Sequence, residues 1–137
     1  MPSTVSSPKI QGSAVGRRKR AIASARISAG TGEITVNGKS AQAYFPSRYA
    51  QVRLLSPLKI SGSETKYHVS LKVAGGGPNG QLDACVLAIA RALVDHKVTH
   101  KTVLRNAGLM TRDSRERQRR MIGTGGKARR RKSSPKR

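Results

Sequence analysis

The sequence predicts a small α+β domain that carries an arginine-rich C-terminal segment. Apolar residues alternate with a period of two in residues 17–28 and 66–73, which is typical of strands with one buried face. Between Leu82 and Leu93 apolar residues recur at three- and four-residue spacing, which predicts an amphipathic helix. This periodicity disappears from Leu109 onward. A chain of 137 residues has room for one domain with extensions.

The N-terminal part is expected to be a flexible leader followed by a β-hairpin. Residues 1–16 are rich in Ser, Pro and Gly and lack periodicity. In residues 17–28 the alternation puts small apolar side chains on one face and mainly basic ones on the other, which predicts a strand with a basic outer face. A turn at residues 29–32 leads to a second short strand at 33–38, which we expect to pair with the first.

The middle of the chain predicts one short helix. Pro46 and Pro57 bracket residues 47–55, and proline is disfavoured inside a helix. The spacing of Tyr49 and Val52 suggests that both face the interior.

A strand at residues 66–73 and two helices complete the predicted domain. The glycine-rich segment 74–80 ends the strand, and Asn79 is expected to be the N-cap of the amphipathic helix. Free backbone amides at this helix start could hold a phosphate. A second helix is predicted at residues 99–108, with Gly108 as its C′ residue.

The charge of the chain indicates a polyanionic partner. It contains 28 Lys and Arg against 6 Asp and Glu, which gives a net charge of +22. Residues 111–137 hold twelve of these cations, nine of them Arg, which grips phosphate through two parallel hydrogen bonds. The sequence has no apolar run long enough to span a membrane, and four aromatic residues are too few for an interfacial belt or for base stacking. Nucleic-acid phosphate is therefore the expected ligand, and no membrane partner is expected.

Catalytic and metal-binding motifs are not found. Residues 32–40 approach a phosphate-loop pattern, but five residues rather than four separate Gly32 from Gly38, so this segment is interpreted as a strand and a turn. The six acids are scattered, and no nucleophile lies at a spacing that suggests a base. Cys85 is the only cysteine, and the sequence supplies no further ligands with which the three histidines could complete a zinc site. We expect no enzyme activity, no cofactor and no metal.

One segment carries a specific family signature. In GGGPNGQLDACVLAIARAL, residues 75–93, three glycines are followed by two free positions, a small residue and Gln, and then by small and basic positions. This pattern resembles the signature of the ninth small-subunit ribosomal protein family. The signature residues are Gly75, Gly76, Gly77, Gly80, Gln81, Ala84, Ala88 and Arg91. The opening segment GRRKRAIASARI and the basic ending are also similar to that family, so the resemblance covers about residues 16–137.

The resemblance implies a fold and a function. It implies a compact split β-α-β domain, a mixed sheet with helices packed on one side, and a long extended basic tail. The expected organisation is a leader at residues 1–16, a globular RNA-binding domain at 17–108 and an arginine-rich tail at 109–137. The implied location is the head of the small ribosomal subunit, in the cytoplasm of a bacterium or inside an organelle such as a plastid.

The implied partners are small-subunit ribosomal RNA, peptidyl-site transfer RNA and neighbouring proteins of the head. The tip residues Lys136 and Arg137 are expected near the transfer RNA. The cations expected to bind ribosomal RNA are Arg17, Arg18, Lys19, Arg20, Arg112, Arg115, Arg117, Arg119, Arg120, Lys127, Arg129, Arg130, Arg131 and Lys132.

Two other classes of function remain open from the residues alone. A chromatin-like DNA-binding protein would also need many cations and few aromatic residues, although its tail is usually richer in Lys. A small enzyme, such as a kinase, could use a similar fold, but the chain lacks a phosphate loop and a catalytic base. Competition by duplex DNA and an assay of nucleotide binding would distinguish these alternatives.

Overall fold

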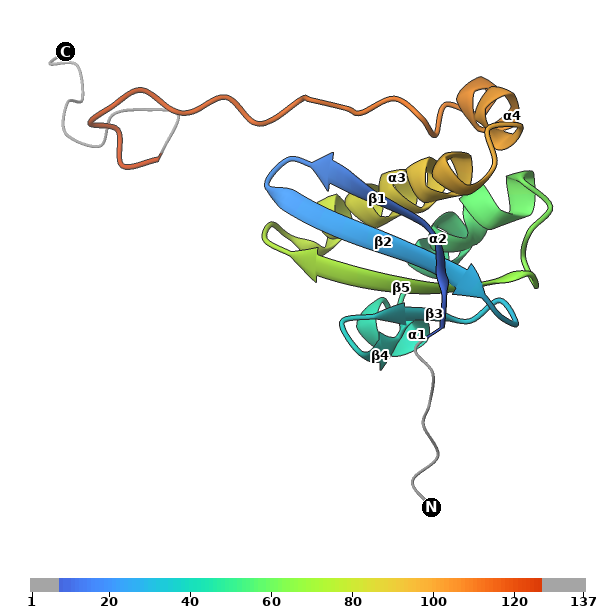
Figure 1. Ribbon diagram of the computed structural model, residues 1–137. Helices are drawn as coiled ribbons and strands as arrows, with labels where there is room; N and C mark the ends of the chain where they lie inside the picture. The colour runs from blue at the N-terminus through green and yellow to red at the C-terminus, as the bar shows by residue number, and fades with distance from the viewer. Residues whose placement is uncertain (1–7, 127–137) are drawn as a thin grey trace, which may run out of the picture.

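The computed structural model describes residues 8–126, which form one mixed β-sheet covered by helices on one face (Figure 1). The five strands are β1 (Ile10–Arg18), β2 (Ala21–Ala29), β3 (Ile34–Val36), β4 (Lys39–Ser40) and β5 (Tyr67–Ala74). The helices are α1 (Ala41–Tyr44), α2 (Arg48–Ile60), α3 (Pro78–His96) and α4 (His100–Asn106). The α+β class and the one-sided mixed sheet are confirmed.

The strands lie in the order β1-β2-β5-β3-β4. β3 and β5 pair in parallel, and the other three neighbouring pairs are antiparallel. The connection from β3 to β5 runs through β4, α1 and α2, and its two parallel strands are direct neighbours. The split β-α-β arrangement implied by the family resemblance is therefore not observed in this sheet.

The first strand begins inside the segment that was expected to be a flexible leader. β1 starts at Ile10 and pairs with β2 over almost its whole length. Its face toward α3 carries Gly12, Ala14 and Gly16. These buried and half-buried residues alternate with exposed ones, but they are too small to give a hydrophobic pattern in the sequence. The prediction for residues 10–16 was wrong for this reason.

The hairpin of the structure also differs from the expected one. Residues 17–28 contain the end of β1, a two-residue turn at Lys19 and Arg20, and most of β2. Lys19 adopts a left-handed conformation with φ of 51°. The second strand predicted at residues 33–38 pairs with β5 rather than with β2, because β5 lies between them. The turn expected beyond this strand is confirmed, since Asn37 and Gly38 both have positive φ.

Helix α3 packs unusually close to β1 and β2. The buried face of β2 consists of three alanines and Ile27, as the alternation predicted. A Cβ atom added to Gly16 would meet the backbone of Ala84 and Ala88 in α3, and one added to Gly12 would meet the carbonyl of Ala92. The small residues therefore allow backbone to approach backbone.

Helix α2 is longer than predicted and turns a different face inward. It runs to Ile60, with Pro57 inside it. Pro57 has no N–H to donate to the Arg53 carbonyl, which instead accepts a 2.7 Å hydrogen bond from the Ser56 hydroxyl. Tyr49 and Val52, expected inside, are 66% and 54% exposed. The side chains that face the core are Ala50, Leu54, Pro57 and Leu58.

The C-terminal half of the domain follows the sequence closely. β5 alternates as predicted, and every residue of the apolar stripe predicted between Leu82 and Leu93 is buried. α3 begins earlier than expected, with Gly77 as its N-cap and Pro78 as the first helical residue, so Asn79 is not the cap. Gly108 has φ of +75° and ends α4, as predicted, with hydrogen bonds from Gly108 and Leu109 to the last turn.

Candidate nucleic-acid interface

Two turns meet at one end of the domain and form a basic surface. One is the β1–β2 turn with its run of four cations, and the other is the glycine-rich β5–α3 turn. The Arg20 carbonyl lies 2.8 Å from the position that a Cβ of Gly75 would occupy, and the Arg18 carbonyl lies 3.4 Å from that of Gly80. Without side chains at these glycines, the two turns touch. We call this region, residues 17–20 together with 75–80, the basic end.

The start of α3 contributes free backbone amides to the basic end. No side chain caps the helix at Gly77, and α3 is 19 residues long. The first amides of a helix point outward and carry the positive end of the helix dipole. Such a helix start beside Lys19 and Arg20 offers a favourable environment for phosphate.

The signature residues have structural roles that explain their types. Gly75 and Gly76 have φ of +74° and +67°, which side chains disfavour. The Gln81 amide donates to the Gly75 carbonyl at 3.0 Å and accepts from the Tyr44 hydroxyl at 2.9 Å, so it ties the turn to α1. Ala84 and Ala88 are fully buried against β1, and Arg91 donates to the Val15 carbonyl at 3.1 Å. The signature therefore describes how α3 is held against the sheet.

Most of the cations expected to bind RNA are exposed where the structure describes them. Within residues 8–126, their side chains form no hydrogen bond or ion pair with the protein. This group consists of Arg17, Lys19, Arg20, Arg112, Arg117, Arg119 and Arg120. Seven unpaired cations are free to neutralise an external anion. The remaining candidates Lys127, Arg129, Arg130, Arg131, Lys132, Lys136 and Arg137 lie outside the described residues.

Arg18 and Arg115 differ from this group because acids of the protein already hold them. The Arg18 side chain is only 15% exposed and lies 3.6 Å from Asp83 and 3.4 Å from Asp113. It also donates to the Arg115 carbonyl at 2.6 Å. Asp83 is shared with Arg53 at 2.8 Å. We call these five residues the clamp, since they connect β1, α2 and α3 to the first residues of the C-terminal segment.

The clamp is electrostatically favourable at its outer end. Three contacts of 2.8 to 3.2 Å join the Arg115 guanidinium to the Asp113 carboxylate. These hydrogen bonds, the Arg115 backbone amide and the charge of Arg18 hold the pKa of Asp113 well below its usual range. Asp113 therefore stays ionised and keeps attracting Arg18.

A cavity of about 220 Å³ opens beside the clamp, between β1, α3 and residues 108–113.

The C-terminal segment passes the basic end. Figure 1 shows residues 109–126 leaving α4, running beside β1 and continuing beyond the end of the domain where the β1–β2 turn lies. The contacts of Arg18 at 113–115 agree with this path. Cations of the segment and of the basic end thus lie toward the same end of the molecule.

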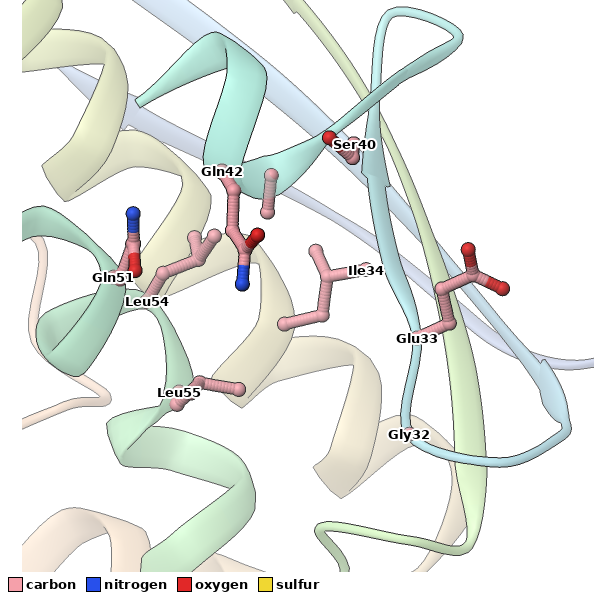
Figure 2. A pocket seen from close by; sticks show the side chains of 9 residues that line it. Gly32, Glu33, Ile34, Ser40, Gln42, Gln51, Leu54 and Leu55 are labelled. Atoms are coloured by element: carbon pink, nitrogen blue, oxygen red, sulfur yellow. The ribbon is translucent and has the colours of Figure 1, made fainter. Parts of the chain in front are cut away.

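A second cavity, on another part of the domain, does not suit nucleic acid. It measures about 380 Å³ and lies between β3, α1 and α2. Figure 2 shows Ile34, Leu54 and Leu55 around it, with Glu33 turned away. Its lining residues include no cation, so it lacks the positive charge that a polyanion requires.

Other site types find no support among residues 8–126. No group of three His, Cys, Asp or Glu side chains there could hold a metal ion. Within the same range, none of the helices has the length and apolar character needed to cross a bilayer.

The sequence did not reveal Asp83, Asp113 and Arg53 as partners of Arg18. Asp83 and Asp113 were interpreted only as scattered acids. An acid at position 113 inside a strongly basic segment was the available signal, because it opposes the local charge. The pairing itself depends on the tertiary path of the chain.

Comparison with known proteins reveals close relatives. Residues 16–137 match the family described as "Ribosomal protein S9/S16". The "Small ribosomal subunit protein uS9" of Phocaeicola vulgatus is 48% identical over 118 residues, which cover 86% of this chain and 91% of the relative. That of Bacteroides thetaiotaomicron is 47% identical over the same shares. The uS9 protein of Corynebacterium efficiens is 44% identical over 109 residues, 80% of this chain, and the match spans only 60% of the relative's length.

Proposed function

Because the chain belongs to the ribosomal protein S9/S16 family, whose members are structural proteins of the small ribosomal subunit and not enzymes, we propose that it binds ribosomal RNA in the subunit head. The basic end and the cations of residues 109–132 make the phosphate contacts. The site of action is the ribosome, and the bacterial origin of the relatives supports the cytoplasm of a bacterium.

The observation that carries this proposal is the convergence of unpaired cations at one end. The β1–β2 turn and the uncapped start of α3 form the basic end, and the C-terminal segment passes it. Two acids that contact Arg18 of the basic end, Asp83 and Asp113, are also paired with Arg53 and Arg115. A large positive potential is therefore left for an external polyanion.

We further propose that the chain tip contacts transfer RNA in the peptidyl site. This rests on the family resemblance of the basic ending and on the sequence KSSPKR, in which Ser133, Ser134 and Pro135 separate the last two cations from the preceding run. Proline fixes its own φ and favours an extended conformation in the residue before it, so the spacer directs Lys136 and Arg137 a short distance outward.

Salt titration of binding to protein-free small-subunit ribosomal RNA tests the first proposal. If residues 109–137 neutralise about 8 phosphates, log K should fall against log salt with a slope of about −6, at ~0.7 per contact. Replacing Arg129, Arg130 and Arg131 with Ala should flatten the slope by about 2. The matched control replaces Arg48, Lys59 and Lys101, exposed cations of α2 and α4, and should leave the slope nearly unchanged.

Competition distinguishes the ribosomal function from DNA binding. Excess duplex DNA should displace little of the ribosomal RNA complex if the proposal is correct. Equal displacement by DNA and by unlabelled ribosomal RNA would favour the chromatin-like alternative instead.

The transfer RNA contact has its own experiment. Small subunits carrying a chain without Lys136 and Arg137 should retain the protein but release peptidyl-site transfer RNA about ten-fold faster, as expected for losing about 1.4 kcal/mol. Equal release from full-length and truncated subunits would exclude the contact, and loss of the protein from the subunit would mean that the tip serves assembly instead.

A further inference from the structure

Among residues 8–126, no helix covers the face of the sheet opposite α2 and α3, and its three long strands contain no acid. Figure 1 shows β1, β2 and β5 in front, with α2 and α3 behind them. None of these strands contains Asp or Glu. An antiparallel sheet often exposes one face to water, but such a face normally mixes charges of both signs.

Strand register places the side chains of this face in rows. Ser24 of β2 lies between Val15 of β1 and Lys72 of β5. In the next row Arg26 lies between Ser13 and Ser70. The row toward the basic end consists of Arg17, Ile22 and Ala74. Arg17 already belongs to the basic end, and we call the other eight residues the open face.

Two cations at the centre of the open face lie close enough to act on one ligand. Arg26 and Lys72 are on neighbouring strands and diagonal to each other in the register, which corresponds to about 7–8 Å between such positions. Both are exposed, and neither side chain is paired with a protein group within residues 8–126. Arg17 connects this pair to the basic end.

The other side chains of the open face are small or uncharged. Three are serines, which donate and accept hydrogen bonds without projecting far from the sheet. Val15 and Ile22 are 43% and 46% exposed. Such a surface is low in relief, carries only positive charge and presents hydroxyl groups between its cations.

These properties match the backbone of double-stranded RNA. The minor groove of an RNA duplex is wide and shallow and displays 2′-hydroxyl groups flanked by phosphates. Serine hydroxyls can pair with the 2′-hydroxyls while Arg26 and Lys72 reach the phosphates on either side. The scarcity of aromatic residues on this face excludes base stacking as the main interaction.

We propose that the open face is a second RNA-binding surface, which takes the shallow groove and backbone of an RNA duplex while the basic end and C-terminal segment bind elsewhere. The proposal rests on the proposed function and extends it, because a protein with two such surfaces holds two RNA elements in a defined relation. Its specificity is for duplex shape and not for sequence.

The first test measures binding of the full chain to protein-free small-subunit ribosomal RNA across a salt series. The variant Arg26→Ser, Lys72→Ser should bind about ten-fold more weakly and lower the salt slope by about 1.5. The control Lys59→Ser, Lys101→Ser removes the same charge from the helices on the other side, and should change both quantities far less. Thermal unfolding of both variants verifies that the domain is intact.

The results separate this inference from the proposed function. Loss of affinity in the open-face variant alone supports the inference. Equal, small losses in both variants while the unaltered chain binds tightly would overturn it and leave the proposed function standing. Failure of the unaltered chain to prefer ribosomal RNA over duplex DNA would overturn both.

A second measurement does not depend on affinity. Ser70→Cys introduces a thiol on the open face, and Thr102→Cys introduces a matched one on α4, while the native Cys85 is buried and unreactive. On addition of protein-free ribosomal RNA, alkylation at position 70 should slow at least ten-fold and that at position 102 should change little. Unchanged alkylation at position 70 in the complex would overturn the proposal.

Discussion

Replacing Arg18 with Met should release the start of the C-terminal segment from the domain. Arg18 is the last residue of β1, and its guanidinium contacts the Asp83 carboxylate of α3 and the backbone carbonyls of Asp113 and Arg115. Met keeps most of the side-chain length and removes the charge and all five donors. The domain should stay folded, because the hydrophobic core of the sheet and helices does not depend on this guanidinium.

The segment should lose about 1 kcal/mol of its attachment to the domain. The hydrogen bond to the Arg115 carbonyl, at 2.6 Å, involves a charged donor that is mostly shielded from water, and should contribute about 1 kcal/mol. The longer ion pair with Asp83 joins β1 to α3 within the domain and persists when the segment opens, so it adds nothing to this loss. The ion pair between Arg18 and Asp113 lies near the surface, so it adds no further energy to this loss.

Proteolysis by an enzyme that cuts after Glu can measure this release. Glu116 lies just beyond the clamp, and the protease specificity is unaffected by changing an Arg. A loss of about 1 kcal/mol should accelerate cleavage at Glu116 about five-fold, because cleavage follows the population of the open segment. Arg17→Met is the matched control, since it removes the same charge from an exposed neighbour that makes no such contact. Equal cleavage rates in the two variants would refute the clamp.

Three further predictions concern the domain itself. Gly16→Ala should lower the free energy of unfolding in urea by about 3 kcal/mol, because its Cβ would meet α3 backbone that cannot yield. The Cβ of Gly77→Ala points into open space, so this change should cost much less, and similar losses would contradict the close packing. Asn37→Ala should cost about 2 kcal/mol by thermal unfolding, because its side chain exchanges two hydrogen bonds, of 2.8 and 3.0 Å, with the backbone of Val73, and an unchanged midpoint would disprove their contribution. Burial raises the pKa of the Cys85 thiol to about 12, so a disulfide reagent at pH 8 should label it only on unfolding; fast labelling of the native protein would show that the site is open.

Patterns carried by large apolar residues predicted their elements correctly. β5 alternates Tyr, Val and Leu without interruption, and α3 repeats Leu, Val and Ile at helical spacing, so burial could be predicted residue by residue. β1 failed because its buried face consists of glycine and alanine, whose role is to admit α3 and not to fill space. The sequence also did not predict which long strand β3 joins, because β3 pairs in parallel with β5, which follows α2 in the chain, and not with the preceding strand β2.

The candidate site was also predictable only in part from the sequence. Charge and arginine content predicted phosphate binding, and these properties need no tertiary structure to recognise. The clamp could not be predicted, since 95 residues separate Arg18 from Asp113. The open face was visible only as the basic outer face of one predicted strand, because Lys72 joins Arg26 through the pairing of β2 with β5.

Quantifying the chain on sucrose gradients of salt-washed ribosomal subunits tests the central claim most directly. The account predicts one copy per small subunit, none on large subunits, and retention through a wash that removes an unrelated basic protein added as a control. Release together with that control protein, or equal amounts on both subunits, would contradict a specific place in the small subunit.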